Sequence, residues 1–221
     1  MRTDSSLGQE VQTDSCWTEA RFGGREDPID QSFSGEERNK WYYNVPGAQG
    51  RTFADLSTIS GLDSISDGRV FAICDFNRDG RLDIALSNSN SPSLNLFQNQ
   101  VHTDHHFVAV KFVGGMKGEQ SEANAEKRLT VRDGFGAVVS FKLPSGMTIM
   151  RELRCGEGFA GQNSNTLVVG IGDANAVDEV LVKWPSGIED SIGTVASGTL
   201  LTLIENGEGG VPQHETEAYR P

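Results

Sequence analysis

The sequence predicts an all-β protein, and three observations support this fold class. Short stretches rich in β-branched and aromatic residues recur along the chain, Gly, Pro, Asn and Asp separate them, and no long amphipathic helix competes with them. Successive strands without intervening helices indicate sheets that pack on one another. We therefore expect a short unit resembling a propeller blade, packed on a C-terminal β-sandwich or barrel.

The predicted strands follow one another between residues 40 and 204. They are Lys40–Asn44, Thr52–Leu56, Arg69–Cys74, Leu82–Ser87, Leu94–Gln98, Phe107–Phe112, Ala137–Leu143, Thr148–Leu153, Thr166–Ile171, Glu179–Trp184 and Thr199–Ile204. Two similar segments, Lys142–Gly146 and Lys183–Gly187, carry Pro at the second place of a turn and Gly at the fourth. This pattern is typical of a type I turn, so we interpret both segments as hairpin corners.

The most informative stretch is Asp75–Asp83, where side chains that carry oxygen stand at alternate positions. Asp75, Asn77 and Asp79 are followed by a glycine, and Asp83 closes the run. Hard cations such as Ca²⁺ take about six to eight oxygen ligands, and Gly80 allows a sharp turn that brings in the backbone carbonyl of Arg81. The spacing therefore predicts a calcium loop.

This loop departs from an EF-hand. The twelfth position, which holds a bidentate Glu in that motif, is Leu86, and both flanks read as strands rather than helices. We interpret the loop as a β-hairpin stapled by Ca²⁺, with a structural rather than a catalytic ion. An acidic surface turn without metal is the alternative.

Composition and charge exclude several classes of function. The 221-residue chain has a formal net charge of −12, which argues against nucleic acid and anionic membranes as partners. No apolar run is long enough to span a membrane, and no signal peptide follows Met1. Acidity and cation binding suit an extracellular or periplasmic protein.

The three cysteines, Cys16, Cys74 and Cys155, show no CxxC spacing, which excludes zinc ribbons and c-type haem. A Cys16–Cys155 disulfide is an open alternative.

Composition also divides the chain into four parts. We expect an acidic N-terminal arm at 1–33, a calcium-binding unit at 34–101, a β domain at 102–205 and a flexible tail at 206–221.

Two further clusters offer weaker alternatives. His102, Asp104, His105 and His106 could bind a transition metal, although a linker entering a strand explains them as well. Glu152 and Glu157 could serve as acid and base in sugar hydrolysis, but an Arg/Glu-decorated strand followed by a loop is the simpler reading. The sequence contains no GxSxG elbow, P-loop, HExxH or dinucleotide-binding fingerprint, so we expect no enzyme activity.

Three residues are candidates for ligand binding at the loops of the second half. Glu157, Phe159 and Trp184 could line a groove that stacks on a sugar. Trp184 stands just before a Pro-Ser-Gly turn, so core packing at the end of a strand is its alternative role.

The first half resembles an FG-GAP/VCBS repeat. The matching segments are Phe53–Ser57, Gly61–Asp63, Asp67–Arg69 and Asp75–Asp83. The second half resembles the ASPIC/UnbV domain in the segments His106–Phe112, Arg132–Val139, Gly156–Phe159, Val169–Gly172 and Val182–Gly187. With the lead-in Ser32–Asn39, the order of motifs over residues 32–205 is similar to bacterial relatives of cartilage acidic protein.

The resemblance implies an extracellular or periplasmic protein with an adhesion-like role and no established catalytic residues. It also implies that Asp75, Asn77, Asp79, the carbonyl of Arg81, and Asp83 ligate Ca²⁺. We therefore expect a non-enzymatic, calcium-stabilised structural or recognition module that mediates protein contacts or adhesion. A carbohydrate-binding or glycan-active module remains an alternative. So does a subunit, homo-oligomeric or otherwise, of a surface assembly that uses the N-terminal arm and open sheet edges.

Overall fold

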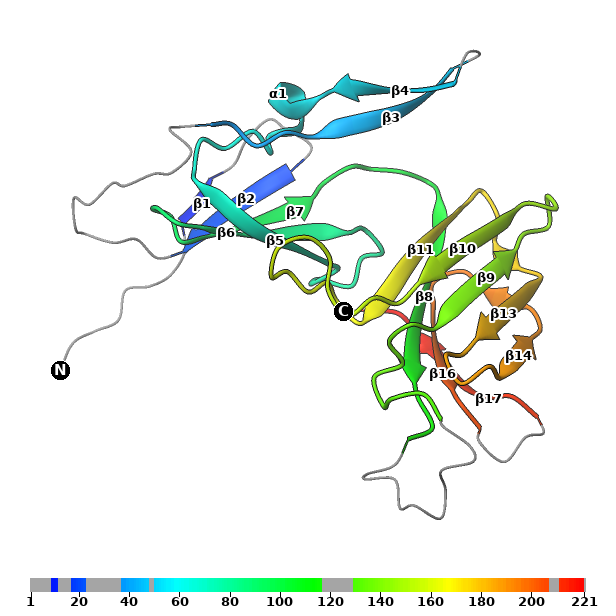
Figure 1. Ribbon diagram of the computed structural model, residues 1–221. Coiled ribbons are helices and arrows are strands. Elements are labelled where there is room, and N and C mark those ends of the chain that lie inside the picture. The colour runs from blue at the N-terminus through cyan, green and yellow to red at the C-terminus, as the bar shows by residue number, and fades with distance from the viewer. Residues whose placement is uncertain are drawn as a thin grey trace. The chain divides into compact units, whose positions relative to one another are not determined.

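The computed structural model describes residues 9–11, 17–22, 37–47, 50–116, 129–206 and 211–220 (Figure 1). The chain forms two compact units. Unit 1 comprises Met1–Cys74, Leu82–His102 and Gly158–Gln162, and unit 2 comprises Asp75–Arg81, Thr103–Glu157 and Asn163–Pro221. The predicted metal loop thus belongs to unit 2, although the strands that it connects belong to unit 1.

Unit 1 contains a five-stranded antiparallel sheet in the order β1-β2-β7-β6-β5. The strands are β1 (Gln9–Val11), β2 (Trp17–Phe22), β5 (Gly68–Cys74), β6 (Asp83–Asn88) and β7 (Leu94–Asn99). Alternate residues of β6 and β7 turn inward, so Leu86 and Phe97 meet Leu62 in a small apolar core, with Trp41 and Ile84 packed against it.

A separate hairpin precedes this sheet in the chain. It consists of β3 (Tyr42–Gly47) and β4 (Gly50–Asp55), and the short helix α1 (Ser57–Ser60) follows. Ser57 links the start of α1 to the residue before β3, since its hydroxyl oxygen accepts the amide of Trp41 at 2.7 Å. The helix ends at Gly61, whose φ of 80° is the left-handed conformation that glycine favours at a helix end. No helix in the described parts of the chain is long and apolar enough to span a membrane.

Unit 2 contains two four-stranded sheets and one short two-stranded pair. One sheet has the order β10-β9-β13-β14, the second β11-β8-β16-β17, and the pair is β12-β15. The strands are β8 (His106–Val113), β9 (Val138–Lys142), β10 (Thr148–Glu152), β11 (Thr166–Gly172), β12 (Ala176–Val177), β13 (Glu179–Lys183), β14 (Glu189–Ile192), β15 (Val195–Ala196), β16 (Thr199–Ile204) and β17 (Gln213–Ala218). All pairings are antiparallel except that of β8 with β16, which is parallel.

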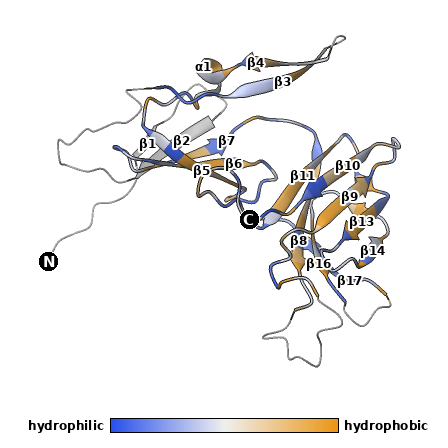
Figure 2. Ribbon diagram, in the orientation of Figure 1, coloured by the Kyte–Doolittle hydropathy of each residue, from blue (hydrophilic) through white to orange (hydrophobic). Residues whose placement is uncertain are grey.

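The main hydrophobic core of the described residues lies in unit 2. Both four-stranded sheets contribute fully buried side chains, such as Val110 from β8, Phe141 from β9 and Leu201 from β16. β8 and β9 are accordingly largely orange in the hydropathy view (Figure 2). Because the strands bury alternate residues, the two sheets share one apolar interior, which is the arrangement of a β-sandwich.

The predicted fold class is confirmed. Each of the eleven predicted strands overlaps an observed one, and none of the described sheets closes into a barrel. The two predicted hairpin corners are also present: the amide of Gly146 donates to the carbonyl of Leu143, and that of Gly187 donates to the carbonyl of Trp184, each at 2.9 Å.

Two predicted segments differ from the structure. Strands β1 and β2 lie within the predicted N-terminal arm, and β17 lies within the predicted flexible tail. Every side chain of β17 is exposed, so it carries no alternating apolar pattern, and pairing with β16 alone makes it a strand. The rest of the arm up to Phe33, and residues 207–210, lie outside the described residues.

Candidate functional site: the loop between β5 and β6 and an adjacent cleft

The loop Asp75–Arg81 is organised by hydrogen bonds to its own carboxylates. The Asp75 carboxylate accepts the amide of Asp79 at 3.1 Å through Oδ1 and the amide of Gly80 at 2.8 Å through Oδ2. The amide of Asp79 also lies 3.3 Å from Asn77 Oδ1. One backbone amide therefore has the side-chain oxygens of Asp75 and Asn77 around it.

The carboxylate of Asp79 completes this cluster. Its Oδ2 accepts the side-chain amide of Asn77 at 2.7 Å, and its Oδ1 accepts the backbone amide of Arg81 at 2.9 Å. The guanidinium of Arg81 forms an ion pair with the same carboxylate. The structure thus brings together three of the predicted ligands, and Arg81 supplies a positive charge beside them.

Gly80 allows the loop to pack closely against Phe107 of β8. Its φ is 84°, and a Cβ placed there would lie 2.1 Å from Cε1 of Phe107. Only glycine therefore allows this approach of the loop backbone to the aromatic ring. The sequence indicated Gly80 as the residue of a sharp turn, whereas its contact with Phe107 depends on the fold.

Tyr219 forms the other support of the loop. It is buried, its ring meets that of Phe107 edge to face with centroids 5.6 Å apart, and its hydroxyl hydrogen-bonds to Asp75. Burial raises the pKa of Tyr219 to about 12, and the Asp75 charge adds to this effect. Burial likewise raises the pKa of the Asp75 carboxyl. The Asp75 carboxylate is therefore partly desolvated and close to a second carboxylate, that of Asp79.

The donor set fits a hard cation. Each carboxylate oxygen can accept more than one partner, so the backbone hydrogen bonds to Asp75 leave capacity for an ion. Within the described residues, no three or more His, Cys, Asp or Glu side chains gather closely enough to hold a metal ion. The loop offers two such residues, with Asn77 as its third side-chain donor.

Asp83 is held differently from the other predicted ligands. It is the first residue of β6, is fully buried, and accepts the amide of Asn99 at 2.8 Å. Arg81 takes part in the cluster through its amide and guanidinium. The contacts described above thus unite Asp75, Asn77 and Asp79 but leave Asp83 and the Arg81 carbonyl apart. Metal ligation by all five residues stays a prediction.

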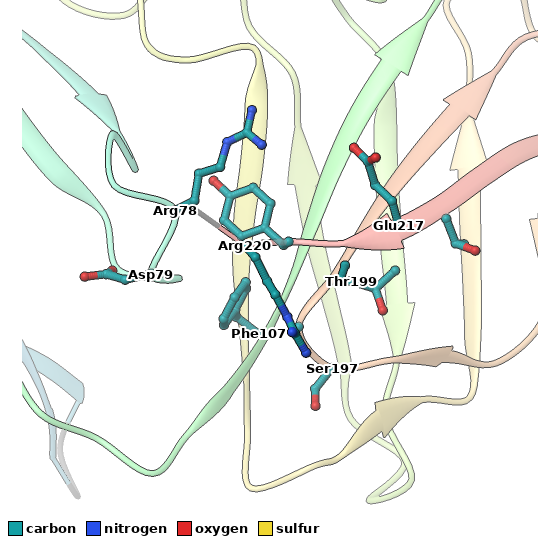
Figure 3. Close-up of a pocket in the computed structure, with 11 residues that line it drawn as sticks. Arg78, Asp79, Phe107, Ser197, Thr199, Glu217 and Arg220 are labelled. Atoms are coloured by element: carbon teal, nitrogen blue, oxygen red, sulfur yellow. The ribbon is translucent and has the colours of Figure 1, made fainter.

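A cleft of about 540 Å³ lies beside the loop, within unit 2 (Figure 3). The loop contributes Arg78 and Asp79, β8 contributes Phe107, and the remaining walls come from the turn before β16 and from the end of β17. None of these residues except Asp79 was a predicted site residue. The end of β17 reaches the loop through long-range pairing, for which the sequence pattern carries no signal.

The predicted sugar groove needs correction at Trp184. Its side chain is 1% exposed, packs edge to face on Phe112, and donates Nε1–H to Asp190 Oδ2 at 2.8 Å. It is a core residue and cannot stack on a ligand. Glu157 is exposed and holds Asn163 at 2.7 Å and Arg154 at 3.2 Å. Phe159 is 82% exposed and belongs to unit 1.

The remaining predicted clusters form surface contacts. His105 lies 3.5 Å from Asp173, and both side chains are exposed. Glu152 and Glu157 both pair with Arg154 at 3.2 Å. Cys155 is an exposed thiol outside any disulfide, Cys74 is half-buried on β5, and Cys16 lies outside the described residues.

Sequence reasoning missed the buried carboxylate of Glu205. Its Oε2 accepts the amides of Gly115 at 2.8 Å and Thr130 at 2.7 Å, and its Oε1 accepts the hydroxyls of Thr130 at 2.8 Å and Ser186 at 2.5 Å. Four donors from three distant segments therefore satisfy one carboxylate. It is one of 31 acidic residues in the chain, and no local pattern distinguishes it.

Comparison with known proteins gives a partial family match, most of which lies in unit 2. Residues 127–210 match the family described as ASPIC and UnbV. This match confirms the resemblance for the segments from Arg132 to Gly187, whereas His106–Phe112 lies outside it. A stretch of 42 residues is 45% identical to cartilage acidic protein 1 of Xenopus tropicalis. It covers 19% of this chain and 6% of that protein, so the chain matches a small part of this relative. The FG-GAP/VCBS resemblance stays a prediction.

Proposed function

We propose that this chain is a non-enzymatic recognition module of an extracytoplasmic protein, and that Ca²⁺ held in the loop between β5 and β6 stabilises it. The observation that carries this proposal is the gathering of Asp75 and Asn77 oxygens at the amide of Asp79, beside the Asp79 carboxylate. Oxygen donors of this kind are the ligands that Ca²⁺ prefers. A bound cation would also offset the repulsion between the carboxylates of Asp75 and Asp79.

The surroundings of the loop support a structural role for the ion. Phe107 and Tyr219 support the loop from β8 and from the end of β17. An ion that orders the loop would therefore also stabilise its contacts with the sandwich. Since binding to the folded state alone adds stability by mass action, the melting temperature should rise with Ca²⁺ concentration.

The surroundings of Glu152 and Glu157, the two carboxylates considered for catalysis, favour a non-enzymatic function. Glu152 and Glu157 are exposed and share one arginine, whereas the general acid of a glycosidase normally sits in an apolar, partly buried environment. An extracytoplasmic location is supported by the acidity of the chain and by its partial likeness to a protein whose name refers to cartilage.

Thermal unfolding tests the calcium proposal. We expect Ca²⁺ to raise the melting temperature of the wild-type chain, Mg²⁺ to raise it less, and chelator to remove the effect. Asp79→Asn should abolish the response, because it removes a ligand charge while preserving the size of the side chain. Asp173→Asn is the matched control, since this aspartate is 95% exposed and lies off the loop.

An unchanged melting temperature in Ca²⁺ and in chelator would refute the stabilising role of the ion. An equal response in the Asp79→Asn variant would place the ion elsewhere in the chain.

A further inference from the structure

We propose that the cleft beside the loop binds a short acidic saccharide, of the size of a disaccharide, with carboxylate groups at two positions and hydroxyl groups between them. This deepens the proposed recognition role, on which it rests, by naming the ligand class. The cleft volume of about 540 Å³ lies in the range of small-molecule sites and accommodates two sugar rings.

Two arginines, Arg78 and Arg220, line the cleft together with two carboxylates, Asp79 and Glu217. The arginines at positions 38, 69, 81, 132 and 154 each pair with an aspartate or glutamate. Among the described arginine side chains, Arg78 and Arg220 of the cleft form no ion pair, and neither does Arg151 outside it, although the chain carries a net charge of −12. Two exposed guanidinium groups without carboxylate partners in an acidic protein favour an anionic ligand.

The two arginines serve different ends of the cleft. Cζ of Arg78 lies over the ring of Tyr219, 6.0 Å from the ring centroid. Arg220 extends past Phe107 toward Ser197 (Figure 3). The charges therefore do not converge on one point. A ligand with a single anionic group would use one guanidinium, whereas a ligand with two spaced carboxylates would use both.

The conformation of Arg78 supports a specific role for this side chain. Its φ is 55°, in the left-handed region that residues with a Cβ adopt at a cost. Gly or Asn would suit this backbone better. An arginine thus occupies a strained backbone position and lines the cleft.

The wall between the arginines carries hydroxyl groups. Ser197, Thr199 and Thr216 line it, and each hydroxyl both donates and accepts hydrogen bonds. Glu217 adds an acceptor, and the Asp79 charge is balanced by Arg81. Sugar hydroxyls, which also donate and accept, match this wall. An acidic peptide presents fewer hydroxyls to this wall.

Calorimetric titration with digalacturonate tests the proposal, run on the full chain in Ca²⁺ and again in chelator. We expect binding to digalacturonate, and at least tenfold weaker binding to its dimethyl ester, which keeps the rings and hydroxyls but lacks the charges. A diglutamate peptide should also bind at least tenfold more weakly than digalacturonate.

Two arginine variants test whether the ligand binds in the cleft. Arg78→Gly removes the guanidinium and suits the positive φ, so the fold is preserved, and Arg220→Gln changes an exposed side chain. Each should weaken binding about tenfold. Arg132→Gln is the control, because this arginine is 81% exposed and outside the cleft. Its affinity should match the wild type.

Absence of binding, equal affinity for the ester, or tighter binding of the peptide would each overturn the saccharide assignment. Wild-type affinity in Arg78→Gly or Arg220→Gln, or an equal loss in Arg132→Gln, would place the ligand elsewhere. If digalacturonate does not bind but Ca²⁺ still raises the melting temperature, only the ligand class is refuted. Binding of digalacturonate without any calcium effect would refute only the stabilising ion.

Discussion

The hydroxyl of Ser186 donates to the buried carboxylate of Glu205 at 2.5 Å and so ties the turn between β13 and β14 to the end of β16. Ser145 occupies the equivalent place in the other Pro-Ser-Gly turn. Both serine oxygens accept the amide two residues on, Ile188 at 3.3 Å and Met147 at 3.4 Å. The two turns therefore share one local geometry, and only Ser186 has a long-range partner among the described contacts.

This pair predicts a difference between two similar substitutions. Ser186→Ala should lower the free energy of unfolding by about 1.5–3 kcal/mol, because it removes a hydrogen bond to a charged group. Ser145→Ala, at an exposed turn, should change it by less than about 0.5 kcal/mol. Glu205→Ala should cost about 3–5 kcal/mol, because four donors lose their acceptor. Denaturant unfolding measures all three, and equal effects of the two serine variants would contradict the role of Glu205.

Replacement of Gly80 should destabilise unit 2 through the contact with Phe107. Gly80→Ala should cost about 2–4 kcal/mol, the sum of a strained positive φ and overpacking against the ring. Gly146→Ala is the matched control: its φ is 82°, but no heavy atom lies within 4 Å of the added Cβ, so about 1 kcal/mol is expected. The measurement is denaturant unfolding.

A second substitution separates the two causes of the Gly80 effect. Phe107→Leu in the Gly80→Ala background should recover part of the loss, because a smaller side chain leaves room for the Cβ. Strict additivity of the two changes would show that the ring and the glycine do not interact.

Arg81→Gln should increase the affinity of the loop for Ca²⁺ under the proposed function. The guanidinium of Arg81 competes with a cation for the Asp79 carboxylate, and its removal preserves the backbone carbonyl that we predict as a ligand. Titration with Ca²⁺, followed by the rise in melting temperature, measures the change. Arg132→Gln again serves as control, and a lower affinity in Arg81→Gln would indicate that the arginine orders the loop instead.

Asp55 in unit 1 should titrate at unusually low pH. The hydroxyl of Ser57, 2.5 Å from Oδ1, is the main cause that lowers the pKa of this carboxyl from 3.8 to about 2, with contributions from the Ser57 amide and Lys40. Because the folded state has the lower pKa, its stabilising contribution is complete above pH 3.8 and is lost as the pH falls from 3.8 toward 2.

Carboxyl chemical shifts followed by NMR measure this titration. Ser57→Ala should move the Asp55 midpoint back toward 3.8, and Lys40→Gln should move it less, since the lysine is the weaker cause. A larger shift in Lys40→Gln than in Ser57→Ala would reverse the assigned order of causes.

Local patterns in the sequence determined much of this protein. Short β-branched and aromatic stretches between turn residues located the core strands, and Pro-Ser-Gly marked two hairpin corners. The spacing of Asp75, Asn77 and Asp79 located the loop whose oxygens gather in the structure. These features depend on residues a few positions apart, so they can be predicted from the sequence before the fold is known.

The tertiary structure decided what surrounds these elements. It placed Phe107 and Tyr219 under the loop, buried Trp184, and gave Glu205 donors from residues 115, 130 and 186. It also made a strand of Gln213–Ala218, whose exposed residues carry no apolar alternation. Each of these outcomes depends on contacts between residues far apart in the chain, and such contacts form only when the sheets have paired and closed over their common core.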